Sequence, residues 1–412
     1  MTITTDALIV GAGPAGLAAA LELRRLGAQR VLVVEREEQA GGIPRHSVHT
    51  GFGLRDMHRL LDGPRYAARY VHLARAAGVE LRTGTSVTDW TAPLTLAVTS
   101  AAGREEIHAR AVVLATGCRE RSRAARLVPG TRPLGVYTTG ALQQFVYLQR
   151  QPAGRRAVVV GAEHVSFSAV LTLAHAGAST VAMVTEHARH QTYAPFKWFS
   201  SWRGRVPILT ASRLTQILGA RRVEAVQVTD LRSGAVRHLA CDTVVFTGDW
   251  IADHELARRG ELTMDPAGGA PRVDQALRTS ARGIFAAGNL LHGAETADVA
   301  ALGGRHAAGA VHAFLQSGQW TARPPLPLLC TAPLRWVSPS AISVDAARPP
   351  RDRFILRVAQ ICPPSQLRVT QGTRELWRER HRRLIPNLPI SLSARWLSRV
   401  DPEGGPVTLS LE

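Results

Sequence analysis

The sequence has few thiols, little lysine, few aromatic residues and no long apolar run. Its cysteines, Cys118, Cys241, Cys330 and Cys362, lie far apart, and no CxxC or CxxxxC pair occurs. A dithiol that attacks a substrate disulfide needs a second thiol nearby, and a protein-bound iron–sulfur cluster needs four close cysteines. Disulfide reductase chemistry is therefore excluded, no iron–sulfur cluster is expected, and we predict that the four cysteines are small buried apolar residues.

The chain has a large positive net charge, and nearly all of its basic residues are arginine. The 412 residues include 50 Lys and Arg against 32 Asp and Glu, a formal net charge of +18, yet Lys197 is the only lysine. Surfaces that bind nucleic acid usually mix Lys with Arg in patches, whereas Arg is spread along this whole chain. We therefore predict no nucleic-acid partner. Some of the positive charge could still assist the binding of an anionic substrate, an acidic electron-transfer partner or anionic lipid.

No apolar run is long enough to span a membrane, and the first predicted strand begins within a few residues of Met1. That beginning leaves no room for a signal peptide, so we expect a cytoplasmic protein without a transmembrane segment. No metal site is predicted. The length is ample for two or three hydrophobic cores.

The first forty residues carry a complete dinucleotide-binding pattern. A predicted buried strand, a glycine-rich turn, a helix and a second strand occur in order, with residues 7–10, Gly11-Ala-Gly13-Pro14-Ala15-Gly16 and residues 31–34 before Glu35-Arg36. Gly11 permits the tight bend, Gly13 lets the backbone approach a pyrophosphate, and Gly16 lets the helix pack closely on the strand. The helix N-terminus attracts phosphates, and Glu35 can accept hydrogen bonds from both ribose hydroxyls.

Further segments resemble the FAD-binding motifs of the pyridine nucleotide-disulfide oxidoreductase superfamily, flavoproteins with two dinucleotide-binding domains. They are Gly41-Gly42, Ala111-Val-Val-Leu-Ala115-Thr116-Gly117 and Thr279-Ser-Ala-Arg-Gly-Ile-Phe-Ala-Ala-Gly288-Asn289. The resemblance covers roughly residues 4 to 320 and implies FAD as the cofactor. The last motif usually ends in Gly-Asp, whose acid holds the ribityl chain, and the amide of Asn289 can still pair with a ribityl hydroxyl. A helix at about 298–315 would point its N-terminal dipole at the flavin pyrimidine.

The resemblance implies the following FAD contacts: Gly11, Gly13, Pro14, Ala15, Gly16, Glu35, Arg36, Gly42, Ile43, Val87, Ala115, Thr116, Gly117, Gly288 and Asn289. The implied fold class is α/β, with two Rossmann-like dinucleotide-binding domains, the second inserted in the first, and a small C-terminal β-rich domain. We expect residues 1–120 and 249–320 to form the FAD-binding domain and residues 121–248 to form a degenerate NAD(P)-binding-like domain, in which two glycines of the turn are replaced. Residues 321–412 would form a Pro-rich linker and the last domain.

The last domain is predicted from period-two apolar spacing interrupted by Pro and Gly, which favours a small antiparallel sheet. The alternating residues include Phe354, Leu356, Val358, Leu367, Val369, Leu388, Ile390, Leu392, Val407, Leu409 and Leu411. Several relatives hold a cysteine-rich iron–sulfur module in this region. Because this chain has none there, we expect an interface or lid domain instead.

The second nucleotide-binding domain has an altered turn. In Gly161-Ala-Glu163-His-Val-Ser166, Glu163 occupies the second glycine position and Ser166 the third. A side chain at the second position blocks a pyrophosphate, and an inward carboxylate would repel it. We favour a domain that does not bind NAD(P)H productively. The open alternative is a shifted binding mode in which Glu163 turns away and hydrogen-bonds ribose or amide, so the role of NAD(P)H stays uncertain.

Four candidate catalytic residues follow Gly42 in a loop that passes beside the flavin ring in two-domain flavoproteins: Arg45, His46, Ser47 and His49. Either histidine could act as a base near neutral pH or serve as hydrogen-bonded scaffolding. Arg45 could grip a substrate carboxylate or phosphate, or cover the flavin pyrophosphate. Ser47 could donate a hydrogen bond to flavin N5 or to substrate.

Other candidates lie farther along the chain. His292 and His306 could also reach the cavity, whereas Trp250 is expected to be a packing residue. Five aromatic residues fall within ten positions. They could form a hydrophobic seam between domains, or an exposed apolar patch that docks a partner subunit or lines the substrate entrance. They are Tyr193, Phe196, Trp198, Phe199 and Trp202.

Two stretches refine the resemblance. Residues 43–67 look like the flavin subunits found with anaerobic-type glycerol-3-phosphate dehydrogenase. The stretch Gly135-Val-Tyr-Thr-Thr-Gly140-Ala-Leu-Gln resembles the α-type flavin subunits of opine oxidases, hydrogen cyanide synthase and dye-linked proline dehydrogenases. These relatives often have cysteine where Ser47 stands, so a thiol role is lost here.

The resemblance implies an FAD-dependent oxidoreductase of the dehydrogenase or oxidase type that acts on a small-molecule substrate. It would take a hydride from a C–H beside an amine or hydroxyl onto flavin N5 and pass electrons to a partner protein, quinone or oxygen. Two alternatives stay open: an NAD(P)H-dependent flavin reductase or oxygenase component, and a non-catalytic flavin-loaded accessory subunit. A partner subunit or a homo-oligomer would be compatible with each.

Overall fold

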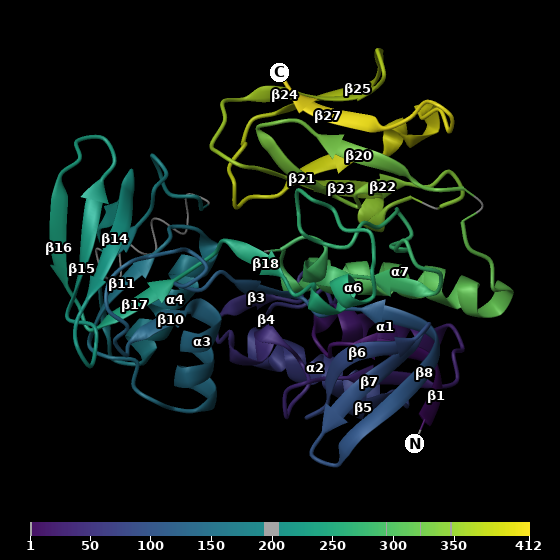
Figure 1. The fold of residues 1–412 in the computed structure, drawn as a ribbon, viewed down its shortest axis with the longest axis horizontal. Helices are drawn as coiled ribbons and strands as arrows, with labels where there is room; N and C mark the ends of the chain where they lie inside the picture. The colour runs from purple at the N-terminus through teal and green to yellow at the C-terminus, as the bar shows by residue number, and fades with distance from the viewer. Residues whose placement is uncertain (1, 193–205, 294, 322, 347) are drawn as a thin grey trace. The chain divides into compact units, whose positions relative to one another are not determined.

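The computed structural model describes residues 2–192, 206–293, 295–321, 323–346 and 348–412 (Figure 1). The chain forms two compact units. One contains Met1–Arg45, Thr50–Cys118 and Ala252–Glu412, and the other contains His46–His49 and Arg119–Ile251. The aromatic cluster from Tyr193 to Trp202 lies outside the described residues.

The first unit is built on a mainly parallel sheet in the order β5-β2-β1-β8-β7-β6, with β19 also paired to β8. Its parallel strands are β1 (Thr2–Val10), β2 (Val31–Val34), β5 (Glu80–Arg82), β8 (Gly103–Leu114) and β19 (Ile284–Ala286). The antiparallel strands are β6 (Ser86–Ala92) and β7 (Thr95–Ser100). All four residues of β2 are apolar and buried, as expected for a strand covered on both faces.

Helices of this unit pack closely because small residues face one another. The helices are α1 (Pro14–Arg25), α2 (Gly63–Ala76), α6 (Glu255–Arg259) and α7 (Ala297–Ser317). A Cβ built at Gly304 of α7 would lie 1.9 Å from the carbonyl oxygen of Ala15 in α1, so only glycine permits this approach. The short elements are η1 (Ile43–His46), β3 (Thr50–Phe52), β4 (Leu61–Asp62) and η3 (Gly288–Leu290).

The second unit repeats the dinucleotide-binding pattern. Its parallel sheet has the order β10-β17-β11-β12-β13. These strands are β10 (Val136–Thr138), β17 (Thr243–Phe246), β11 (Arg156–Val160), β12 (Ser179–Val184) and β13 (Ile208–Leu209). An antiparallel sheet contains β14 (Ser212–Leu218), β15 (Ala225–Asp230) and β16 (Val236–Ala240). The helical elements are α3 (Thr139–Gln143), the π-helical segment η2 (Gln144–Leu148) and α4 (His164–His175). The strands β9 (Cys118–Glu120) and β18 (Trp250–Ala252) pair where the chain passes between the units.

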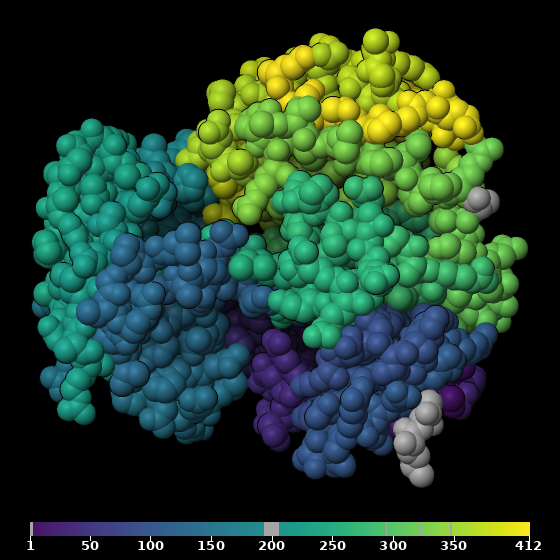
Figure 2. Space-filling view, viewed as in Figure 1, coloured from purple at the N-terminus to yellow at the C-terminus, as the bar shows by residue number. Residues whose placement is uncertain are grey.

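The C-terminal part of the first unit holds two sheets around one core. The first has the order β22-β20-β27-β24-β25 and the second β21-β23-β26. Their strands are β20 (Leu326–Cys330), β21 (Leu334–Ser338), β22 (Ala341–Ile342), β23 (Arg353–Val358), β24 (Ser365–Gln371), β25 (Arg374–His381), β26 (Ile390–Ser393) and β27 (Val407–Leu411). The turns η4 (Pro350–Asp352) and η5 (Arg395–Arg399) complete it. Figure 2 shows this region, in light green and yellow, against the green segment that contains α7.

The predicted fold class is confirmed, including the β-rich C-terminal region, but the prediction of one small antiparallel sheet was wrong. Two sheets are present, and β20 pairs with β27 in parallel. The alternating residues of β23, β24, β26 and β27 do face the core, where the fully buried Trp396 packs on Phe354 at 5.3 Å between ring centroids. Within the described chain, no helix has the length and apolar character needed to cross a membrane.

Candidate functional site

The glycine-rich turn after β1 is tight on one side and open on the other. A Cβ built at Gly16 would lie 1.9 Å from the carbonyl oxygen of Gly11, and one at Gly11, where φ is 105°, would lie 2.5 Å from that of Ala115. By contrast, a Cβ at Gly13 would meet no heavy atom within 4 Å. Gly13 is also the N-cap of α1 and supplies no side-chain cap. The turn therefore combines space with uncapped helix N–H groups, as a bound pyrophosphate requires.

Glu35 is fixed beside this turn. One carboxylate oxygen accepts the Ala12 N–H at 2.9 Å and the other accepts the Glu37 N–H at 3.0 Å. The backbone carbonyl of Glu35 accepts the Thr85 N–H at 2.9 Å, which brings the segment before Val87 to the same edge of the sheet. Each carboxylate oxygen has a further lone pair for a ribose hydroxyl. Arg36 is exposed and pairs with Asp253 at 3.5 Å.

Gly41 and Gly42 place the following loop against the turn. The Gly41 N–H donates to the Ala12 carbonyl at 2.8 Å, and a Cβ at Gly42, where φ is 63°, would lie 2.9 Å from the Gly13 Cα. The Arg45 guanidinium donates to the Glu37 carboxylate and the Gln39 carbonyl, each at 2.5 Å, while Ile43 is exposed. These contacts favour Arg45 as a residue that holds the cofactor loop rather than one that grips substrate.

The second FAD motif contains an acceptor without a partner. The Asn289 amide nitrogen donates to the Glu295 carbonyl at 3.0 Å, but its buried Oδ1 has no hydrogen-bond partner among the described residues. Buried polar atoms are nearly always paired, so this oxygen is suited to a ribityl hydroxyl. Gly288, with φ 73°, lies against Ala15, and the Thr116 hydroxyl donates to the Asp253 carbonyl at 2.7 Å. The open turn, Glu35 and Asn289 together fit an FAD molecule.

The helix after this motif begins at Ala297 and ends at Ser317, close to the predicted 298–315. The buried Asp298 in its first turn accepts the Arg55 N–H at 3.2 Å and the Arg55 guanidinium at 3.1 Å. A carboxylate is favourable at a helix N-terminus, and the Arg55 guanidinium is its counter-ion here. The sequence reasoning did not identify this Arg55–Asp298 pair.

His46 and Ser47 meet two residues that were not predicted as site residues. Gln143 Oε1 lies 3.3 Å from His46 Nδ1 and accepts the Ser47 hydroxyl at 3.4 Å. The Gln143 amide nitrogen donates to the Ser168 hydroxyl at 2.8 Å. All four side chains belong to the second unit and are buried. The sequence signal that could have pointed to Gln143 is its place as the last residue of the Gly135–Gln143 stretch that resembles the α-type flavin subunits.

The remaining candidate residues have contacts of other kinds. His49 is partly buried and its N–H donates to the Ser47 carbonyl at 2.9 Å. His306 pairs with the Gln275 carbonyl at 2.8 Å, which is a scaffolding contact. Burial lowers the pKa of both His292 and His306. Trp250 is partly buried in β18.

The second turn is filled by its own side chains. The buried Glu163 points inward: Oε2 accepts the Ala162 N–H at 2.9 Å, and Oε1 accepts the Thr247 hydroxyl at 2.5 Å. Ser166 Oγ accepts the Glu163 N–H at 3.2 Å and lies 2.7 Å from the Thr247 hydroxyl. A carboxylate therefore occupies the helix N-terminus that a pyrophosphate would need. This geometry gives no support to the alternative in which Glu163 turns away.

Neighbouring charges stabilise that arrangement. The partly buried Arg126 donates to the carbonyls of Thr247 and Gly248 at 2.8 and 3.0 Å, and its positive charge lies near Glu163. The acid at the end of β12, Glu186, forms two 2.9 Å hydrogen bonds with Arg213. Glu186 is thus engaged with Arg213. It is the second residue after β12, whereas Glu35 directly follows β2 and accepts hydrogen bonds from two backbone N–H groups.

The cysteines carry no sign of thiol chemistry. Cys118, Cys241 and Cys362 are buried as predicted, whereas Cys330 is only partly buried. Burial raises the pKa of Cys241 to about 11 and that of Cys330 to about 12, and it also raises the pKa of Cys362. These three thiols are therefore protonated at neutral pH and poor nucleophiles.

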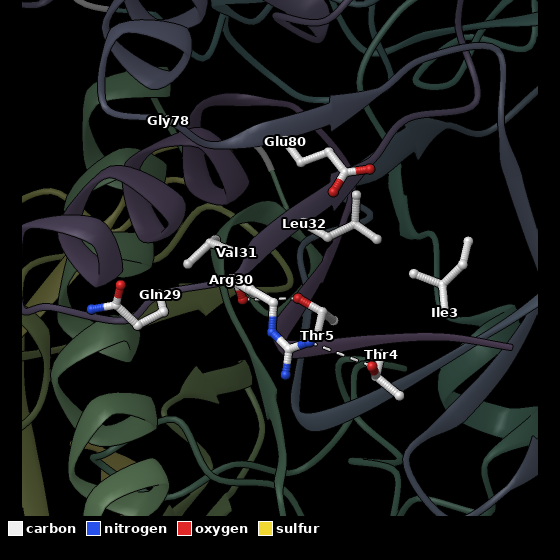
Figure 3. Close-up of a pocket in the computed structure, with 9 residues that line it drawn as sticks. All are labelled: Ile3, Thr4, Thr5, Gln29, Arg30, Val31, Leu32, Gly78 and Glu80. Atoms are coloured by element: carbon white, nitrogen blue, oxygen red, sulfur yellow. Dashed lines mark hydrogen bonds between the residues drawn. The ribbon is translucent and has the colours of Figure 1, made fainter.

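A pocket of about 160 Å³ lies at the amino ends of β1 and β2 (Figure 3). Thr4, Thr5, Gln29 and Arg30 line part of it, and the Arg30 guanidinium donates to the Thr4 hydroxyl at 3.5 Å. Ligands of open α/β sheets bind outside the carboxyl ends of the strands, where the glycine-rich turn lies. This pocket is therefore separate from the candidate site.

Known proteins share this architecture. The chain is 26% identical to a ferredoxin–NADP reductase of Ignicoccus hospitalis over 332 residues, which cover 76% of this chain and 99% of that protein. It is 35% identical to sarcosine oxidase subunit alpha of Corynebacterium sp. over 190 residues, 42% of this chain but 19% of that subunit. The structure of T. acidophilum thioredoxin reductase matches with a TM-score of 0.63 at 20% identity, over 76% of this chain and 99% of that one. This last likeness concerns the fold.

The family model for pyridine nucleotide-disulphide oxidoreductases matches residues 5–304. That range contains the open first turn, the filled second turn and the segment that ends in Asn289. Members of this family bind FAD, in agreement with the residues of the first unit. The chain belongs to the pyridine nucleotide-disulphide oxidoreductase family.

Proposed function

We propose that this flavin-dependent oxidoreductase is a dehydrogenase or oxidase that takes a hydride from a C–H beside an amine or hydroxyl of a small substrate. Its electrons then pass to a partner protein, a quinone or oxygen. The observation that carries the proposal is the contrast between the two turns: Gly13 leaves space, whereas the Glu163 carboxylate fills the equivalent position. FAD, when bound, supplies the two-electron acceptor.

His46 is the residue we assign to proton transfer. When the substrate C–H bond breaks, the hydride leaves with both electrons, and the neighbouring N–H or O–H loses its proton as a C=N or C=O bond forms. A neutral imidazole titrates near pH 6.5 in the unperturbed state and can accept that proton. His46 follows Arg45 directly in the chain, four residues after Gly42, so the cofactor loop and the base are covalently close.

The similarity to sarcosine oxidase subunit alpha supports an amine as the oxidised group. That similarity has the highest identity of the three reported, although it involves 19% of the subunit. The absence of a CxxC pair and the protonated state of the buried thiols argue against a disulfide substrate. A small secondary amine or amino acid is therefore the first class of substrate to test.

A second candidate function is an NAD(P)H-dependent reductase or the reductive component of an oxygenase. The match to ferredoxin–NADP reductase over nearly the whole length of that protein favours it. Against it stands Glu163, since a buried carboxylate near 4 Å from a phosphate would cost about 4 kcal/mol at an effective dielectric constant of 20. We therefore place it second.

The experiment uses FAD-loaded protein under anaerobic conditions. Secondary amines, amino acids and hydroxy acids are mixed with it singly, and loss of the yellow flavin absorbance is followed. The expected result is rapid, saturable bleaching by one of these classes and a loss of about 10²-fold or more in the His46→Asn variant. Bleaching by NADPH alone, with every substrate class inactive, would overturn the proposal.

A further inference from the structure

We propose that Gln143 is a positioning residue that holds His46 with its proton on Nδ1, so that Nε2 is the nitrogen that takes the substrate proton. The role of Nε2 rests on the proposed function. The inferred tautomer does not, because it is argued from the orientation of the Gln143 amide. No sequence motif assigned Gln143 or Ser168 to the site.

The orientation of the Gln143 amide decides the tautomer. Its Oε1 faces both His46 Nδ1, at 3.3 Å, and the Ser47 hydroxyl, at 3.4 Å. A carbonyl oxygen has two lone pairs and no hydrogen, so both neighbours must act as donors toward it. A neutral imidazole that donates from Nδ1 can accept a proton only at Nε2.

Ser168 contacts the other side of the same amide. The Gln143 Nε2 donates to Ser168 Oγ at 2.8 Å, the shortest bond of the group. If the amide turned over, its NH2 would face the Ser47 hydroxyl and the histidine, and its oxygen would face Ser168. In that orientation His46 Nδ1 would have to accept from the amide and the ring proton would lie on Nε2, whereas the two serine hydroxyls can donate or accept in either case. The tautomer of His46 therefore reports the orientation of the Gln143 amide. The longer contacts to His46 and Ser47 suit a site that tightens when substrate binds.

Two consequences follow for the neighbouring residues. The Ser47 proton is directed to Gln143, which weighs against the expectation that Ser47 donates to flavin N5 or substrate. The π-helical segment η2 begins at Gln144, directly after Gln143. Single π-helical turns are frequent at functional sites, because the extra residue re-aims side chains at the end of a helix.

The test reads the tautomer directly. Nitrogen-15 NMR of histidine-labelled, FAD-loaded protein separates Nδ1-protonated from Nε2-protonated rings, and the His46→Asn variant identifies the His46 signals among the 15 histidines. We expect the Nδ1-protonated form in the parent protein and in Gln143→Glu, which keeps an acceptor oxygen. In Gln143→Leu the tautomers should mix, and Ser168→Ala should produce a weaker change in the same direction.

Kinetics give the second readout. With the substrate class found above, Gln143→Leu should lower the limiting rate of flavin bleaching at least about tenfold, because a histidine in the wrong tautomer can lose up to about 10⁴-fold. The substrate concentration at half-saturation should change little, and Gln143→Glu should restore most of the rate. Gln371→Leu, which removes a buried amide of the C-terminal domain that bonds to Asp401, is the matched control and should leave both readouts unchanged.

An Nε2-protonated His46 in the parent protein would overturn the proposal. An unchanged tautomer and rate in Gln143→Leu would do the same. Failure of the proposed function has a different signature: the NMR result for His46 would stand, but no amine or hydroxy acid would bleach the flavin in any variant.

Discussion

Arg357 of β23 and Glu295 form a buried ion pair in which Nη2 and Oε1 are 2.5 Å apart and the side chains are 4% and 5% exposed. The carbonyl of Glu295 accepts the Asn289 amide N–H at 3.0 Å. The C-terminal domain therefore contributes the counter-ion for the segment that orients Asn289. This contact gives the C-terminal region a structural part beside Asn289, the residue we propose as the ribityl ligand.

Replacing Arg357 by Met should destabilise the protein strongly. The Glu295 carboxylate would remain buried without its partner, a change that typically costs about 3–5 kcal/mol. FAD should also dissociate more readily, because the Asn289 segment loses its anchor. Denaturant unfolding and FAD retention after dialysis measure the two effects.

The double variant Arg357→Met with Glu295→Gln should recover part of the loss, since it removes the unpaired charge. The exposed pair Arg323–Glu403 provides the control. Arg323→Ala should change the free energy of unfolding by less than about 1 kcal/mol. Equal effects at the buried and the exposed pair would contradict this account.

Glu35→Ala should weaken the retention of FAD. Hydrogen bonds to a charged acceptor contribute about 1.5–3 kcal/mol each, so losing the ribose contacts lowers affinity by about tenfold or more. Glu186→Ala is the matched control, because Glu186 lies two residues after the equivalent strand β12 of the second unit and pairs with Arg213. Release of bound FAD by heat, before and after dialysis, supplies the measurement. Equal occupancy in both variants would show that Glu35 is not the ribose ligand.

Acid should destabilise the protein through its buried histidines. Burial lowers the pKa of His292 in the folded state, with Glu295 opposing that shift, whereas the unfolded chain titrates near 6.5. As the pH falls through about 6.5, the unfolded state takes up a proton that the folded state does not, so the free energy of unfolding decreases. His292→Gln should flatten the dependence of the melting temperature on pH between about 5 and 8.

His238 lies exposed on β16 and serves as the comparison for this effect. His238→Gln should leave the pH dependence as it is in the parent protein. A His292→Gln variant with the same slope as the parent would mean that other groups, such as the partly buried His306, dominate.

Replacing both Glu163 and Ser166 by glycine should open the second turn. The variant removes the inward carboxylate and the Ser166 hydroxyl, at a cost of about 1 kcal/mol of helix stability per glycine. We expect its flavin to be reduced faster than that of the parent by NADH or NADPH. Thr247→Val, which removes the hydroxyl that holds Glu163 but leaves the carboxylate in place, should give a much smaller gain. If the double variant is no faster than the parent, the turn is not what limits nicotinamide binding.

The first FAD-binding turn was predictable because its requirements are local. Gly11, Gly13 and Gly16 lie within six residues; Gly11 and Gly16 have no room for a Cβ, and Gly13 leaves space in front of the turn. The alternating strands of the C-terminal region were likewise visible. The arrangement of these strands in sheets was not predictable. The pairing of β20 with β27 joins segments almost 80 positions apart, and the spacing of apolar residues does not show whether two strands run parallel or antiparallel.

The proposed catalytic group of His46 and Gln143 was only half predictable for the same reason. His46 stood out by its residue type and its place after Gly42, but its partner Gln143 lies 97 positions away. The replaced glycine at Glu163 signalled an altered turn. The inward direction of its carboxylate depends on Thr247, 84 positions on, and became visible only in the folded chain.

The most direct test of the central claim is anaerobic stopped-flow mixing of the unmodified, FAD-loaded protein with NADH and, separately, with NADPH. If the Glu163 carboxylate closes the second turn, the flavin will be bleached only slowly, and the rate will not saturate at micromolar nucleotide. Rapid and saturable bleaching at micromolar concentrations would contradict the account and identify the second domain as a working coenzyme site.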